Sequence, residues 1–202
     1  RTEAFVERAG RQLLVALHEA TLGKPFEEII ADEFNNISPV EAQRIYLTIC
    51  VLNRLGVLVR AGIISRVHGV PFEEFKQKFF APLEQIVKVA YNPIIRDYEY
   101  AARHQHIAEI VFDNILRDRE KRFDFYINSL KALNLGYMND RRAFRQMTSA
   151  RILLELFPEY EMVKLIYQFG EEVAGEDAHL LHQMGIYEMH RPNGNLEKSS
   201  EY

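Results

Sequence analysis

Cysteine and tryptophan are almost absent from this chain: its 202 residues include one cysteine, Cys50, and no tryptophan. A single cysteine excludes a disulfide within the chain, and it also excludes zinc sites built from several thiolates. Cys50 lies inside the apolar run from Ile45 to Leu52, where a buried and unreactive thiol is the usual outcome. We therefore expect a structural thiol and a reducing, cytoplasmic setting.

Long apolar runs and long blocks of one charge sign are lacking as well. No run approaches the roughly 20 apolar residues that a membrane-spanning helix needs, and no secretory signal is visible. The net charge of -4 and the pI of about 6.0 give no general attraction to nucleic acid or to anionic membranes. The 48% hydrophobic content is ample for a core, so composition indicates one or two globular units.

Catalytic motifs are the third absence. The chain has no G-x-x-x-x-G-K-[ST] loop for phosphate binding and no G-x-G-x-x-G fingerprint. His179 and His182 could share a helix face, but without H-E-x-x-H or a third ligand a surface or packed pair is favoured. The adjacent carboxylates Glu73 and Glu74 fall in a predicted first helical turn, where capping and solvation explain them. The sequence therefore predicts that this chain is not an enzyme.

Residues 1 to 36 predict a small unit of two helices. The first helix carries an apolar stripe, and Gly23 is positioned to end it. The residues of this stripe are Phe5, Ala9, Leu13, Ala16, Leu17 and Ala20. The second helix covers residues 26–34, with Pro25 near its start and acidic residues in its first turn, where the helix dipole favours them.

Residues 37 to 104 predict three short helices followed by a β-hairpin, which is the pattern of a winged-helix domain. In Ser38-Pro39-Val40-Glu41 a capping serine, a proline and a glutamate stand in the order that starts a helix. That helix runs to about Leu55, and the other two cover residues 61–67 and 72–80. The hairpin arms are residues 87–91 and 96–102, on either side of an Asn-Pro turn signal.

The chain from residue 105 to 202 predicts helices only. Short loops separate most of them, as in consecutive antiparallel helix pairs that begin an α-solenoid. The expected helices cover residues 106–117, 119–134, 141–156, 159–173 and 177–190. The expected fold is therefore mainly α: a small helical unit (1–36), a winged helix with one β-hairpin (37–104) and antiparallel α-hairpins starting a solenoid (105–202).

Winged helices often bind DNA through their third helix, but here that helix is a poor match. Its first turn carries Glu73 and Glu74, which would repel phosphates, and its exposed positions hold no arginine for bidentate contact with guanine. The hairpin tip offers only Arg96, next to Asp97. We therefore expect protein contacts rather than DNA binding, with a DNA-binding transcription regulator as the alternative.

The segment from Asp97 to Phe112 is the most informative part of the chain. It alternates like a strand and then changes, at Arg103 and His104, to the helical period of Ile107 and Ile110. Two interpretations stay open for these two residues. His104 is a helix-start histidine satisfied by local backbone, or it joins Arg103 and the free amides of the helix start in a phosphate site.

Ala102-Arg103-His104, followed by a helix with Ile107, Glu109 and Ile110, resembles a motif of STAND-class signalling ATPases. In that class, the motif follows the winged helix, and its histidine reaches the β-phosphate of bound ADP. Residues 12–30 are similar to the lid of bacterial members, many of which act in anti-phage defence. Residues 194–202 resemble the start of the second helix of a tetratricopeptide repeat, with Ser199 where that repeat has alanine.

The resemblance implies that this chain is the lid, winged helix and first sensor helices of a longer protein. ADP or ATP would be held by a nucleotide-binding domain outside the chain, with His104, and Arg103 beside it, as the contact to the cofactor. The implied partners are that domain, a protein trigger on the helical repeats and further copies upon activation, with neither nucleic acid nor membrane involved. The second alternative is a helical protein-interaction scaffold without nucleotide.

Overall fold

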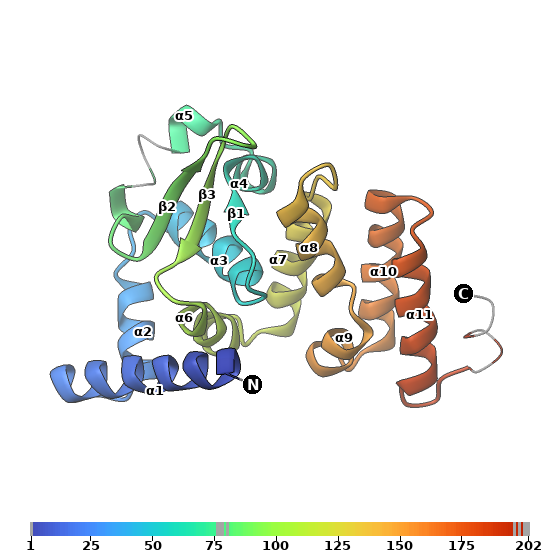
Figure 1. The fold of residues 1–202 in the computed structure, drawn as a ribbon, viewed down its shortest axis with the longest axis horizontal. Helices are drawn as coiled ribbons and strands as arrows, with labels where there is room; N and C mark the ends of the chain where they lie inside the picture. The colour runs from blue at the N-terminus through green and yellow to red at the C-terminus, as the bar shows by residue number, and fades with distance from the viewer. Residues whose placement is uncertain (1, 76–78, 80, 196, 198, 200–202) are drawn as a thin grey trace.

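The computed structural model of this chain describes residues 2–75, 79, 81–195, 197 and 199. Helices dominate the fold, and they surround one small three-stranded antiparallel sheet that includes a hairpin. The sheet lies at one end of an elongated molecule, and the last helices form the other end (Figure 1). Among the described residues, no helix combines the length and apolar character needed to cross a bilayer.

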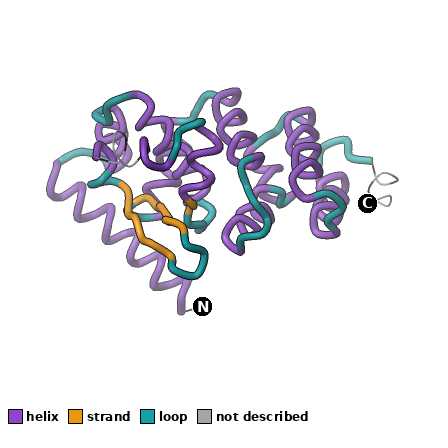
Figure 2. The backbone as a smooth tube through the Cα atoms, turned by 90° about the horizontal axis from the view of Figure 1, so that it is seen from above, coloured by secondary structure: helices purple, strands orange, loops and turns teal. Residues whose placement is uncertain are grey.

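The first two helices, α1 (Thr2–Leu22) and α2 (Phe26–Asn35), meet at Gly23, whose φ of +64° allows the chain to turn. α2 faces the core with four buried apolar residues, whereas α1 runs beneath it and α6 (Figures 1 and 2). The predicted stripe of α1 does not form this contact, because Leu13 and Leu17 are 60% and 58% exposed. Leu14 and Val15 pack against the core instead. The side chains of the predicted stripe residues before Gly10 lie outside the described residues.

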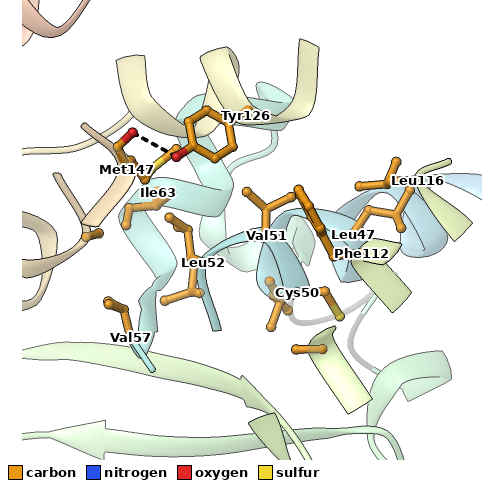
Figure 3. Close-up of a cluster of buried hydrophobic side chains, with 14 of the residues drawn as sticks. Leu47, Cys50, Val51, Leu52, Val57, Ile63, Phe112, Leu116, Tyr126 and Met147 are labelled. Atoms are coloured by element: carbon orange, nitrogen blue, oxygen red, sulfur yellow. Dashed lines mark hydrogen bonds between the residues drawn. The ribbon is translucent and has the colours of Figure 1, made fainter. Parts of the chain in front are cut away.

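Helix α3 (Val40–Asn53) is the centre of the core. Every residue from Ile45 to Asn53 is buried, because α3 packs on the sheet and also on α6 and α7 (Figure 3). Cys50 is fully buried, and burial raises the pKa of its thiol, which confirms the prediction of a structural cysteine. The predicted capping by Ser38 is wrong, since Pro39 occupies the cap position.

The sheet has the strand order β1-β3-β2, formed by β1 (Val59–Arg60), β2 (Val87–Asn92) and β3 (Asp97–Ala102). The hairpin of β2 and β3 is confirmed, with Val87 opposite Ala102. The sequence did not reveal β1, because two residues are too few to show an alternating pattern. It pairs with β3 and makes a three-stranded sheet where we expected a hairpin alone.

Short helices connect β1 to β2. α4 (Ala61–His68) ends at Gly69 as predicted, and α5 (Phe72–Glu74) and η2 (Ala81–Leu83) follow. The predicted helix 72–80 lies in part outside the described residues, because residues 76–78 and 80 are not among them. Phe75 is buried and packs edge-on against Tyr100 of β3 at 5.2 Å between ring centroids.

The second half of the chain is a series of helices that advances in one direction away from the sheet (Figure 1). α7 packs on α10, and α11 packs on both α9 and α10. The predicted helix 106–117 is an α-helix that continues into a π-helical turn. The helices of the second half of the chain are α6 (Gln105–Ile110), η3 (Val111–Ile115), α7 (Arg119–Lys131), α8 (Met138–Met147), α9 (Ala150–Leu156), α10 (Tyr160–Ala174) and α11 (Ala178–His190).

The prediction of one helix over residues 141–156 is wrong, because α8 ends at Met147 and α9 starts at Ala150. Two side-chain hydroxyl groups donate hydrogen bonds to backbone carbonyls near the break. The Thr148 hydroxyl donates to the Phe144 carbonyl at 2.9 Å, and the buried Tyr126 hydroxyl donates to the Met147 carbonyl at 2.8 Å (Figure 3). The Phe144 carbonyl also accepts the Thr148 amide at 2.9 Å, whereas the Met147 carbonyl, which accepts the Tyr126 hydroxyl, lies at the break itself.

Candidate functional site

The junction between β3 and α6 is held by hydrogen bonds to two neighbouring segments. The Ala102 amide donates to the side-chain oxygen of Asn53 at 3.1 Å, and the Arg103 amide donates to the Ile86 carbonyl at 3.2 Å. The Gln105 side chain donates to the Arg54 carbonyl at 3.0 Å. The residues on both sides of His104 are therefore attached to the end of α3, and Arg103 is also attached to the segment before β2.

His104 is the N-cap residue of α6. Its Nδ1 accepts a hydrogen bond from the His106 amide at 3.1 Å, so one free amide of the helix start is satisfied by the ring. An accepting Nδ1 carries no hydrogen, and the proton of the neutral ring is therefore on Nε2. In the described part of the chain Nε2 has no hydrogen-bond partner, and the side chain is partly exposed.

Burial and the charges around His104 both favour its neutral form. Burial lowers the pKa of the ring, and the nearby His106, Lys88 and Arg11 lower it further, while Glu109 acts in the opposite direction. A neutral imidazole with Nδ1 engaged offers one N–H donor to a ligand. An anion near Nε2 would be attracted by the same positive groups that oppose protonation of the ring.

Arg103 is engaged elsewhere. Its guanidinium forms an ion pair with Glu33 of α2, and about a third of each side chain is exposed. The pair attaches the first two helices to the end of β3. The structure thus places the two predicted site residues next to each other: His104 Nε2 has no partner among the described residues, and Arg103 has Glu33 as a carboxylate partner.

A second layer of aromatic and charged groups holds α1 against this junction. His106 and Arg11 both contact Glu109, at 3.0 Å and 3.3 Å, and the ring of His106 stacks on Phe26 at 6.2 Å between centroids. His18 of α1 packs edge-on against the same Phe26 ring at 5.2 Å. His104 is thus close to elements from the N-terminal helices as well as from the sheet.

The histidines at the junction and elsewhere in the chain raise the question of metal binding. Within the described ranges, no three His, Cys, Asp or Glu side chains converge in a way that could hold a metal ion. His182 is exposed and His179 is partly buried, which agrees with the expected surface or packed pair. What the junction can do chemically is donate one hydrogen bond, from His104 Nε2, to an anion near Lys88 and Arg11.

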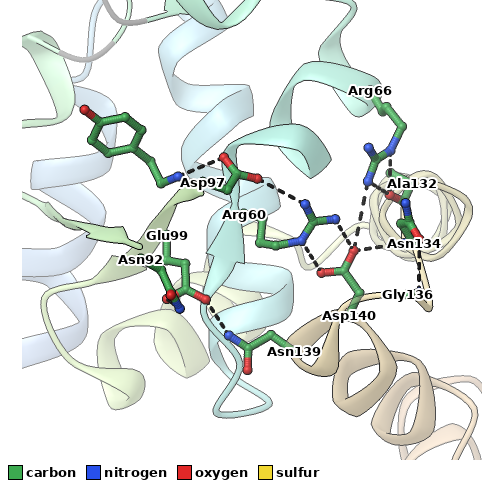
Figure 4. Close-up of polar contacts among 11 residues, drawn as sticks. Arg60, Arg66, Asn92, Asp97, Glu99, Ala132, Asn134, Gly136, Asn139 and Asp140 are labelled. Atoms are coloured by element: carbon green, nitrogen blue, oxygen red, sulfur yellow. Dashed lines mark hydrogen bonds and ion pairs between the residues drawn. The ribbon is translucent and has the colours of Figure 1, made fainter. Parts of the chain in front are cut away.

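A buried ion-pair network that sequence reasoning missed joins the sheet to α8 and to the end of α7 (Figure 4). Arg60 of β1 binds both carboxylate oxygens of Asp140 at 2.8 and 2.7 Å, and it also contacts Asp97 at 3.0 Å. Asp140 has no exposed surface and accepts the Asn134 amide at 2.9 Å. The Arg60 guanidinium stacks on the Tyr137 ring at 3.5 Å.

The only sequence signal for this network was Arg60 itself, a charged residue between apolar neighbours. Its partner Asp140 is 80 positions away and stands in the first turn of a helix, where an acidic residue is usual. Glu99 on β3 adds a second link, because the Asn139 side chain donates to it at 2.6 Å. The sheet and the helical series are therefore joined through polar contacts as well as through the core.

Comparison with known proteins found no matching family model, no matching curated protein and no matching solved structure.

Proposed function

We propose that this chain is the regulatory segment of a STAND-class signalling NTPase and that His104 senses ADP held by a separate nucleotide-binding domain. The observation that carries the proposal is the state of the imidazole. Its Nδ1 is fixed by the His106 amide, its Nε2–H is free, and the pKa is lowered so that the ring is neutral. Such a group can donate one directed hydrogen bond to a phosphate oxygen.

The order of the elements supports the same proposal. The succession α3, β1, α4, α5, β2 and β3, with sheet order β1-β3-β2, is that of a winged helix. The two N-terminal helices lie next to α6 and η3, which directly follow its last strand, where a lid would close on nucleotide (Figure 1). The series from α7 to α11 provides the first helices of a solenoid on which a protein trigger would bind.

In this proposal the segment is a two-state switch. While ADP is bound, His104 links the winged helix to the nucleotide-binding domain and keeps the protein closed. The trigger binds better to the open state, which releases this contact and permits assembly of several copies. Such coupling between sites is typically worth about 1–3 kcal/mol, or roughly 5- to 150-fold in affinity.

Arg103 has a different role in this mechanism from the one the resemblance implies. Because its guanidinium is paired with Glu33, it positions the lid helices beside the sensor histidine. Its replacement would therefore act indirectly, by loosening α2, whereas replacement of His104 removes the group that contacts phosphate.

The test compares His104→Asn with His104→Ala in the protein that carries the nucleotide-binding domain. Asparagine preserves the N-cap of α6 and alanine does not, so His104→Ala should cost about 1 kcal/mol of stability and His104→Asn almost none. Both variants should lose ADP affinity by about tenfold. Calorimetric titration with ADP and urea denaturation measure the two effects separately. Unchanged ADP affinity in both variants would contradict the proposal.

A further inference from the structure

A cleft of about 340 Å³ lies between α3, the end of α4 and the first half of α7. Arg44 and Leu47 line it from α3, and Val67 and His68 line it from α4. The α7 residues are Lys121, Asp124, Phe125 and Asn128. This volume is within the range of sites that hold small organic molecules. We refer to these eight residues as the α3–α7 cleft.

Apolar side chains form one part of the α3–α7 cleft. Leu47 is 7% exposed, and Val67 and Phe125 are partly buried and pack against the core. A small apolar group fits such a surface. Its binding removes apolar surface from water, which contributes roughly 25 cal/mol of free energy per Å².

Charged side chains form the rim. Arg44 and Lys121 are exposed, and neither forms an ion pair or a side-chain hydrogen bond within the part of the chain that the structure describes. Asp124 is the single acidic residue of the cleft. Since the rim carries two positive charges against one negative charge, its potential favours one additional anionic group.

His68 adds a neutral polar group to the inner end of the cleft. Its Nε2 is 2.9 Å from the Thr48 hydroxyl, which is fully buried on α3. Burial lowers the pKa of His68 to about 4, and Arg44 adds to this effect. The ring is therefore uncharged at neutral pH, and Nδ1 has no hydrogen-bond partner among the described residues.

From this combination we infer that the α3–α7 cleft binds a small molecule with an aromatic or similarly apolar body and a single carboxylate or phosphate group. The apolar body lies on Leu47, Val67 and Phe125, and the anionic group lies between Arg44 and Lys121. A long polyanion fits poorly, because Asp124 interrupts the positive rim and the cleft is small.

The position of the cleft gives the ligand a structural effect. α3 and α4 belong to the sheet-bearing part of the molecule, and α7 is the first helix of the series that leads away from it. A bound molecule contacts both parts at once. It therefore stabilises the packing of α7 on α3 and α4, whatever the function of His104.

The experiment titrates the isotopically labelled chain with phenyl phosphate and benzoate and follows the NMR signals of His68 and of the α7 amides. Inorganic phosphate carries only the anionic group of the proposed ligand, and benzyl alcohol carries only the aromatic body. We expect both aromatic anions to shift these signals with one dissociation constant each, and each half-ligand to bind at least tenfold more weakly.

Lys121→Gln is the principal variant, because Lys121 is exposed and its replacement leaves the core unchanged. It should weaken phenyl phosphate binding by about five- to tenfold. Arg145→Gln is the matched control, since it removes one positive charge from an exposed position on α8 and should leave binding unchanged. Equal effects of the two variants would show unspecific attraction and overturn the inference.

Three other outcomes also overturn it. If inorganic phosphate bound as tightly as phenyl phosphate, the apolar surface would take no part in binding. Signal changes centred on α8 rather than on His68 and α7 would place the anion elsewhere. Absence of any shift at millimolar concentrations of all four probes, in a chain whose spectrum shows that it is folded, would exclude the site.

Discussion

At the scale of single residues, His68 is a group whose charge between pH 4 and pH 7 is controlled by the fold. Its folded-state pKa of about 4 lies below the value near 6.5 expected in the unfolded chain. The unfolded state therefore binds the proton more readily. The stability associated with the neutral ring is complete above pH 6.5, and it is lost as the pH falls towards 4.

This difference predicts an acid-dependent loss of stability that His68→Gln should remove. The lowering of the pKa from 6.5 to about 4 corresponds to roughly 3 kcal/mol, and partial exposure of the ring reduces this to about 2 kcal/mol. Urea denaturation of the original chain and the variant at pH 7 and pH 4 gives the comparison. Parallel losses in both proteins would mean that His68 is not the responsible group.

The charged groups that face His68 allow a second test of this prediction. Arg44 lies on its own side of the cleft, and Lys121 and Asp124 face it from α7. Since Arg44 contributes to the lowered pKa, Arg44→Gln should raise the pKa of His68 and move the loss of stability to a slightly higher pH. The NMR titration of the His68 ring measures this directly.

Features of single residues could be predicted from the sequence where they depend on neighbouring positions alone. The change from strand to helix at Arg103 and His104 was visible in the sequence, because both periods are local. The pairing of Arg103 with Glu33 was not, since the two are 70 positions apart. The hydrogen bond from the His106 amide to His104 is local in sequence, but it depends on a rotamer that residue spacing does not specify.

At the scale of elements, α1 shows that an apolar stripe and a buried face can differ. Leu13 and Leu17 lie on the predicted stripe yet are more than half exposed, while the neighbouring Leu14 and Val15 pack against the core. The stripe followed from the period of the helix alone. Which face is covered depends on where α2 and α6 lie, and the period carries no information on that.

We predict that Leu13→Lys and Leu17→Lys change the free energy of unfolding by less than about 0.5 kcal/mol each, as at other exposed positions. Ile30→Ala on α2 is the control, because Ile30 is 1% exposed and its truncation should cost about 2–5 kcal/mol. Thermal and urea denaturation measure all three variants. A loss above 2 kcal/mol in either lysine variant would show that the face is covered in solution.

At the scale of the whole molecule, the link between the sheet and the helical series depends on Arg60 and Asp140. The Arg60 side chain is 3% exposed and that of Asp140 is 0% exposed. Removing Asp140 takes from the buried Arg60 the carboxylate that it binds through two nitrogens and leaves it only the single contact with Asp97 among the described residues. Loss of one partner of a buried ion pair typically costs about 3–5 kcal/mol. Apolar replacement of both partners avoids that penalty.

We therefore predict that Asp140→Ala destabilises the protein by about 3–5 kcal/mol and that the double variant Arg60→Met, Asp140→Leu regains most of the loss. The comparison pair is Arg119 and Glu159, which meet at 2.6 Å but are 63% and 40% exposed. Arg119→Ala should cost less than about 1 kcal/mol. Urea denaturation of the original chain and the three variants tests the set, and a double variant no more stable than Asp140→Ala would contradict it.

The sequence by itself determined the local features of this protein: the ends of α2, α4 and α11, the hairpin, the buried thiol and the mainly helical class. Each depends on turn residues, helix caps or a repeating apolar pattern within about 20 positions. The tertiary structure decided the third strand, the break between α8 and α9, the covered face of α1 and the Arg60–Asp140 pair. These features depend on which distant segments pack together, because burial and charge pairing act across space and leave no periodic pattern along the chain.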